Sequence, residues 1–186
     1  SGNTAYVSSG GNDGTGVVGN ISKPFLTANA AIAALNNAVD GALIILSSTS
    51  QIDITDYDTT SYPYSLTITN FSYQNISVES SGSFGLLTVK TPAQFIIDTR
   101  SIFTIDDTFN LDCDTFIVLD SSVGAVNMTG VIKCNVLEIT ANVNITVSAD
   151  VIEWTKSANV GVTGGFTYNI CPPRQWKAII SQTDTD

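Results

Sequence analysis

Residues 94–140 read QFIIDTRSIFTIDDTFNLDCDTFIVLDSSVGAVNMTGVIKCNVLEIT and hold three runs of apolar and β-branched residues. The runs are QFIID at Gln94, TFIVLD at Thr115 and NVLEIT at Asn135, so they recur at a nearly constant interval. A recurring unit of about 20 residues that contains several short strands is typical of a β-solenoid, because each coil buries its inward side chains only by stacking on the next coil.

The same spacing recurs elsewhere in the chain. LTI at Leu66 and LTV at Leu87 are separated by one such interval, and the same interval separates Cys113 from Cys134. Short runs rich in Ile, Val and Thr continue over residues 42–167, and these residues favour strands because their χ1 angles are restricted. We therefore predict an all-β protein of about six parallel coils at roughly 20 residues per coil. A β-sandwich or jelly roll is the alternative, although the Asn-Gly and Asp-Gly turns of two-residue hairpins are missing from this region.

One segment near the N-terminus has a helical period instead. Its apolar stripe consists of Phe25, Ala28, Ile32, Leu35 and Val39. The spacing predicts an amphipathic helix over Thr27 to Asp40, with Thr27 as the N-cap and Gly41 as the C′ glycine. We expect this helix to cap the first coil, since an open end of a solenoid exposes unpaired backbone groups.

Composition divides the chain into three segments. Residues 1–41 hold an N-terminal strand, a loop rich in Gly, Asn and Ser, and the capping helix. Residues 42–170 hold the β-helix coils. Residues 171–186 begin with CPPR and end in an acidic stretch, which predicts a C-terminal cap or a linker to a downstream domain.

Charge and residue usage exclude several classes of function. The chain has 17 acidic and 7 basic residues, and its net charge of -10 makes nucleic acid and anionic membrane surfaces poor partners. It contains no histidine, which removes His-based catalytic triads and imidazole metal sites. No run of roughly 18 to 20 apolar residues is present, so membrane insertion is not expected.

Two N-terminal segments resemble a known protein family. YVSSGGNDGTG at residues 6–16 and KPFLTANAAIAAL at residues 23–35 resemble the first strand, turn and Ala-rich capping helix of pectin-lyase-like proteins. The resemblance implies a right-handed, single-stranded parallel β-helix. It also implies that the turn at residues 12–14 and the Pro24-Phe25 step organise the cap. It implies no particular activity, because lyases, hydrolases, epimerases, adhesins and phage tail proteins share this fold.

The C-terminal segment resembles a second group of proteins. WKAIISQTDTD at residues 176–186 resembles the opening of a segment that follows β-helix or fibre domains in some bacteriophage virion proteins. It implies a structural or adhesive module of a phage tail, fibre or other virion appendage, assembled as a homo-oligomer, most simply a trimer, and in contact with host-surface polysaccharide. The alternative is a secreted polysaccharide lyase or glycoside hydrolase of the same fold.

Four carboxylates are the candidate catalytic residues: Asp106, Asp107, Asp112 and Asp114. Carboxylates on neighbouring coils could bind Ca²⁺, or serve as the acid and base of a glycosidase at about 5 to 9.5 Å from each other. The alternative is that these residues fill solvated turns and bond the backbone. The family's lyases pair Ca²⁺-binding acids with a basic proton acceptor, for which Arg100 and Lys133 are the neighbouring basic residues. We expect no other cofactor.

Aromatic residues cluster in TDYDTTSYPYSLTITNFSYQN at residues 55–75. The candidate ligand-binding residues are Tyr57, Tyr62, Tyr64 and Tyr73. Aromatic faces beside Asp and Asn side chains suit the stacking of sugar rings and the recognition of their hydroxyl groups. The alternative is a long loop whose tyrosines pack on the flank of the coils or against a sister chain.

The two cysteines that lie one period apart, Cys113 and Cys134, are expected to stack on adjacent coils. As thiols they would pack as small buried hydrophobic residues. A disulfide between them is also conceivable at the spacing of neighbouring strands.

Overall fold

The structure of the chain is a computed structural model. It describes residues 2–58, 62–80, 83–84, 86–99, 103–105, 109–120, 126–141, 145–153, 156–162 and 166–170. Side chains are described for residues 2–58, 62–80, 86–98, 109–117 and 132–135. The elements are β1 (Thr4–Val7), α1 (Ala28–Leu35), β2 (Gly41–Ile45), β3 (Ile52–Ile54), β4 (Leu66–Asn70), β5 (Ile76–Ser80), β6 (Ser83–Phe84), β7 (Leu87–Lys90), β8 (Gln94–Thr99), β9 (Phe103–Ile105), β10 (Asn110–Asp120), β11 (Val126–Ala141), β12 (Ile145–Glu153), β13 (Lys156–Val162) and β14 (Phe166–Ile170).

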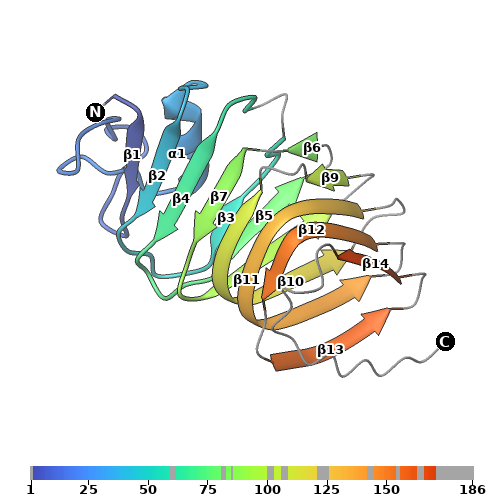
Figure 1. The fold of residues 1–186 in the computed structure, drawn as a ribbon. Coiled ribbons are helices and arrows are strands. Elements are labelled where there is room, and N and C mark those ends of the chain that lie inside the picture. The colour runs from blue at the N-terminus through green and yellow to red at the C-terminus, as the bar shows by residue number, and fades with distance from the viewer. Residues whose placement is uncertain are drawn as a thin grey trace.

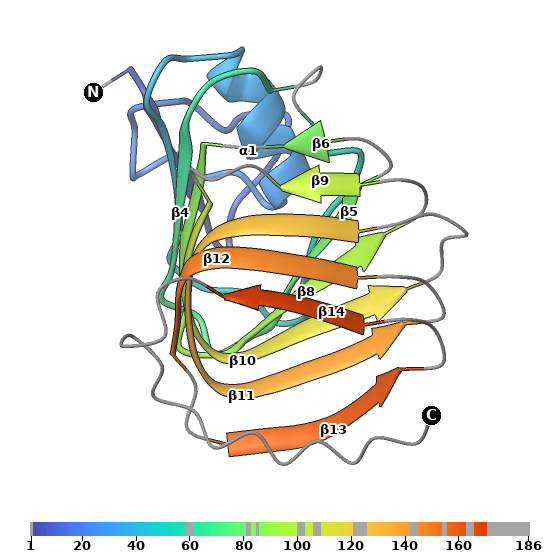
Figure 2. The same cartoon turned by 45° about the vertical axis from the view of Figure 1, so that its right-hand side comes forward.

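The strands form one curled sheet in which every described pair is parallel (Figure 1). A first ladder runs β1-β2-β4-β7-β10-β11-β12, and a second runs β3-β5-β8-β10-β11-β13. A third joins β6, β9, β11, β12 and β14. The long strands β10, β11 and β12 curve from one ladder into another, as Figure 2 shows. The all-β parallel prediction is confirmed, whereas the sandwich and jelly-roll alternatives, which are built from antiparallel pairs, disagree with this pairing.

The repeat in the sequence sets the register of the ladders. Leu66 pairs with Leu87, and Cys113 pairs with Cys134, as their spacing in the sequence predicts. Thr115 likewise pairs with Gln94 on one side, but on the other side it pairs with Val136 rather than with Asn135. Stacked strands thus repeat the same buried and exposed positions from coil to coil.

The core consists of the inward positions of successive strands. Burial alternates strictly along β2 and β4, since successive side chains of a strand point to opposite faces. The rings of Phe109 and Phe116 each pack against Phe95, with ring centroids 6.3 and 6.1 Å apart. Cys113 and Cys134 are buried and are both free thiols.

The outer edge of β1 is covered by the loop that precedes α1. The backbone N–H of Phe25 donates to the carbonyl of Tyr6 at 2.8 Å, and the N–H of Ser8 donates to the carbonyl of Phe25 at 3.0 Å. The N–H of Gly19 donates to the carbonyl of Thr4 at 2.7 Å. These bonds satisfy backbone groups that an open edge strand would present to other chains.

Helix α1 packs against β1, β2 and β3 through its buried residues Ala28, Ala31 and Leu35. Thr27 is the N-cap, and its hydroxyl accepts a hydrogen bond from the N–H of Ala30 at 3.2 Å. Asp13 extends this cap, because its carboxylate accepts bonds from the N–H groups of Leu26 and Thr27 at 2.8 and 2.9 Å.

The predicted C-terminal end of this helix is wrong. The helix ends at Leu35, where Asn36 takes the left-handed conformation with a φ of 50° and donates its N–H to the carbonyl of Ala33. Gly41 begins β2 instead of capping the helix, and Val39 is 59% exposed. Asparagine replaces glycine at the cap, since its short side chain tolerates the left-handed region. None of the described helices is long and apolar enough to span a bilayer.

Candidate functional site

The structure separates the four candidate tyrosines into two pairs. Tyr57 and Tyr62 are buried in the core, whereas Tyr64 and Tyr73 are exposed. Only exposed rings can present a face to a ligand without rearrangement of the core. The buried pair and Tyr73 line two separate hollows, whereas Tyr64 is not among the described lining residues of either one.

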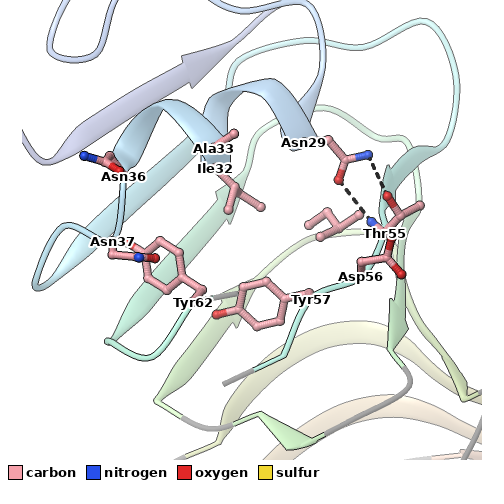
Figure 3. Close-up of a pocket in the computed structure, with 10 residues that line it drawn as sticks. Asn29, Ile32, Ala33, Asn36, Asn37, Thr55, Asp56, Tyr57 and Tyr62 are labelled. Carbon is pink, nitrogen blue, oxygen red and sulfur yellow. Dashed lines mark hydrogen bonds between the residues drawn. The ribbon is translucent and has the colours of Figure 1, made fainter. Parts of the chain in front are cut away.

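The buried pair lines a hollow of about 330 Å³ between α1 and the segment after β3, which we call the helix-side pocket (Figure 3). Its lining residues are Asn29, Ile32, Ala33, Asn36, Asn37, Ile54, Thr55, Asp56, Tyr57 and Tyr62. The side-chain amide of Asn29 accepts a bond from the N–H of Thr55 at 3.0 Å and donates one to its hydroxyl at 3.2 Å. These two bonds tie the helix to the second ladder at one end of the pocket.

The tyrosine rings form the opposite wall of the helix-side pocket. Their centroids are 6.1 Å apart with an interplanar angle of 24°, and the hydroxyl of Tyr62 donates to the carbonyl of Ala38 at 2.9 Å. Burial raises the pKa of Tyr57, so this phenol stays neutral. Both rings are engaged in packing, which makes this wall part of the core rather than a stacking surface for a ligand.

The second hollow lies where the chain bends from the first ladder into the second, and we call it the bend groove. It measures about 350 Å³. Its described lining residues are Thr69, Asn70, Phe71, Tyr73, Lys90, Thr91, Pro92 and Asp112. The groove brings together Tyr73 and Asp112, which the sequence placed in two separate candidate sites.

Two aromatic rings stand out from the wall of the bend groove. Phe71 is 63% exposed and Tyr73 is 86% exposed, which is unusual for side chains of this size. Both lie in the short turn between β4 and β5. Exposed aromatic side chains beside a hollow mark a binding surface more often than isolated apolar residues elsewhere on a protein do.

The turn that carries these rings is held by the buried side chain of Asn70. Its carbonyl oxygen accepts bonds from the N–H and the hydroxyl of Ser72 at 2.9 and 2.7 Å. Its amide donates to the carbonyl of Gln74 at 2.9 Å and to the hydroxyl of Thr91 at 3.0 Å. The N–H of Phe71 also donates to the carbonyl of Ile45 at 2.8 Å. The rings are therefore presented on a turn that is already ordered, which lowers the entropy lost on binding.

Register places opposite charges on the other side of the groove. Lys90 pairs with Thr69 on one neighbouring strand and with Asp112 on the other. All three side chains point outward, and those of Lys90 and Asp112 are exposed. Lys90 was missed as a site residue, although the period of the repeat places it one coil before Asp112.

Of the remaining candidate carboxylates, Asp114 is described and is not among the described residues that line this groove. Asp114 accepts bonds from the side-chain amide of Asn135 and from the hydroxyl of Thr115, both at 3.1 Å. Asp106 and Asp107 lie outside the described residues, as does Arg100. The carboxylate pair of a glycosidase therefore stays a prediction.

Metal binding by the same carboxylates also stays a prediction. Within the part of the chain that the structure describes, no three His, Cys, Asp or Glu side chains gather in a way that could hold a metal ion. Lys133, the second candidate base, is exposed and is the register partner of Asp112 on β11.

Comparison with known protein families, with curated proteins and with solved structures finds no match to this chain.

Proposed function

We propose that this chain is an adhesive β-helix module that binds host-surface glycans through the bend groove. The scaffold in this proposal is a right-handed, single-stranded parallel β-helix of about six coils. The parallel ladders and their repeating register support it, since they stack coil on coil as such a helix requires.

The glycan proposal rests on the two exposed rings beside a groove that also holds a cation and a carboxylate. The apolar face of a sugar ring packs against an aromatic face, while its hydroxyl groups need both donors and acceptors. Phe71 and Tyr73 supply the faces, Lys90 supplies donors and Asp112 supplies acceptors. Their position on ordered strands and an ordered turn suits a preformed binding site.

The biological setting in this proposal is a phage tail, fibre or other virion appendage, with the module assembled as a homotrimer. It is supported by the resemblances of the N-terminal and C-terminal segments described above. Light scattering on the chain tests the assembly, and a monomeric mass would contradict it.

Glycan binding is tested on a glycan array with the wild-type chain and a Phe71→Ala/Tyr73→Ala variant. We expect the variant to lose at least about tenfold in affinity, because removal of the rings abolishes stacking. The matched control is Tyr64→Ala, which removes an exposed aromatic side chain that is not among the described residues lining the groove. Circular dichroism establishes that each variant is folded. Equal binding by the double variant and the wild type, or no glycan bound by the wild type, would overturn the proposal.

A further inference from the structure

We infer that the bend groove selects neutral glycans over acidic ones. This inference rests on the proposed function and concerns the same site. It follows from the charges that line the groove, from their position in the register and from the hydrogen bonds that its floor has already made.

Lys90 and Asp112 are the charged side chains among the described residues of the groove. They are register partners on β7 and β10, so their backbones lie one strand spacing apart, about 4.8 Å. Asp112 has Lys133 as its register partner on the other side, and Lys133 pairs in turn with Glu153 on β12, so residues of opposite charge alternate along this column. Their charges therefore offset one another locally, although the whole chain carries a net charge of -10. The groove therefore offers a donor and an acceptor side by side without a net charge that would attract an ion.

A neutral sugar uses both of these groups. Neighbouring hydroxyl groups on one ring can accept from the ammonium of Lys90 and donate to the carboxylate of Asp112. An acidic sugar placed in the same way would bring its carboxylate close to Asp112, and like charges at that distance repel. The acidic character of the whole chain adds to this repulsion at long range.

The floor of the groove does not compete for the polar groups of a ligand. Asn70 and Thr91 are both buried there, and they bond to each other at 3.0 Å. The hydroxyl of Thr91 also accepts a bond from the N–H of Ala93 at 3.3 Å. Discrimination by charge is thus left to Lys90 and Asp112, while the rings of Phe71 and Tyr73 supply contacts that are common to all sugar rings.

The experiment compares two sets of oligosaccharides of equal length: neutral hexose oligomers and uronic-acid oligomers. For the wild-type chain we expect a neutral oligomer to bind at least about tenfold more tightly than the best uronic-acid oligomer, with little dependence on salt. Asp112→Lys creates a groove with two cations. We expect this variant to prefer uronic-acid oligomers and its binding of them to weaken as salt is added.

The matched control is Asp53→Lys, which changes the net charge by the same amount at an exposed residue of β3 that is not among the described lining residues. We expect this control to keep the wild-type preference. Wild-type binding of uronic-acid oligomers that equals or exceeds neutral binding, but still depends on Phe71 and Tyr73, would overturn the inference and leave the proposed function standing. A reversal of preference in Asp53→Lys as complete as in Asp112→Lys would also overturn it. Absence of binding to every set would overturn both.

Discussion

The hydroxyl of Tyr62 occupies the space that a Cβ atom on Gly41 would enter, and it donates a hydrogen bond to the carbonyl of Ala38 at 2.9 Å. The first residue of β2 therefore has to be small so that a tyrosine from the following segment can reach the loop after α1. This contact joins the loop after α1, the start of β2 and the segment that precedes β4.

Gly41→Ala should destabilise the chain by about 1 to 3 kcal/mol, because the added methyl group displaces the Tyr62 hydroxyl. Tyr62→Phe removes that hydroxyl at a cost of about 1 kcal/mol. In the double variant the two costs should not add, since the methyl group then meets no hydroxyl. Urea unfolding of all three variants measures this coupling. Gly10→Ala is the control, as a Cβ there would meet no atom within 4 Å. Additive costs would contradict the prediction.

Asn70→Ala should destabilise the chain by about 2 to 3 kcal/mol, because it leaves several buried donors and acceptors without their bonds. The control is Asn20→Ala, whose side chain accepts one bond from the N–H of Ser22 in an exposed turn at 3.0 Å. Chemical denaturation should show a much smaller loss for that control. Similar losses for both variants would show that the network around Asn70 adds nothing to stability.

The carboxylate of Asp13 should make the cap sensitive to acid. Burial opposes its ionisation, but hydrogen bonds from Thr27 and Leu26 prevail and hold its pKa below 3.8. The folded state thus binds this proton less readily than the unfolded state does. The stabilisation is fully present above the usual carboxyl pKa of about 3.9, and it is lost as the pH falls through the lowered pKa.

The variant that tests this is Asp13→Asn, which keeps a side-chain acceptor but removes the charge. At pH 7 it should be less stable than the wild type by less than about 1 kcal/mol, because the site is exposed. At pH 3 the difference should shrink. Asp53→Asn, which alters an exposed carboxylate bonded to the Gln51 side chain, should change little at either pH. The outcome that would count against this mechanism is an equal difference at both pH values.

The stacked thiols should be unreactive in the folded chain. Burial raises the pKa of Cys113 well above its ordinary value and that of Cys134 to about 12, so little thiolate is present at pH 8. In a Cys171→Ser background, a thiol reagent should modify both residues at least about tenfold more slowly in buffer than in denaturant. A further Thr67→Cys change, at an exposed position of β4, supplies a thiol that should react quickly. Rapid modification of Cys113 or Cys134 in the folded chain would contradict their burial.

The stacking of parallel strands could be predicted because the sequence repeats at the spacing that separates paired residues. Residues that pair across neighbouring strands recur at the spacing of one coil, so Leu66 with Leu87 and Cys113 with Cys134 were paired correctly. The end of α1 was not predicted, since Asn36 takes a conformation for which glycine was the expected residue. A side chain that tolerates the left-handed region leaves no unique signal.

The candidate site could be predicted only in part. Tyr62 and Tyr64 differ in burial although they are close neighbours in sequence, and their segment has no alternating pattern that would distinguish them. Asp112 and Tyr73 were each identified, but their meeting in one groove depends on register across two coils. Counting back from Asp112 by one and then two periods leads to Lys90 and Thr69, which are its neighbours in register. These three residues border the turn of Tyr73, so the count would have predicted that Asp112 and Tyr73 share one groove.

The bonds that Phe25 and Gly19 make to β1 give the sheet a fixed starting point. Because that edge is satisfied, strands can be added to the first ladder only in the direction of β12. Insertion of one complete period beyond Asp112 would lengthen the stack by about 4.8 Å and leave both the covered edge and the bend groove in place. The distance between the groove and the far end of the scaffold can therefore change in steps of one strand spacing. The length of the module and the ligand specificity of its groove can then evolve separately.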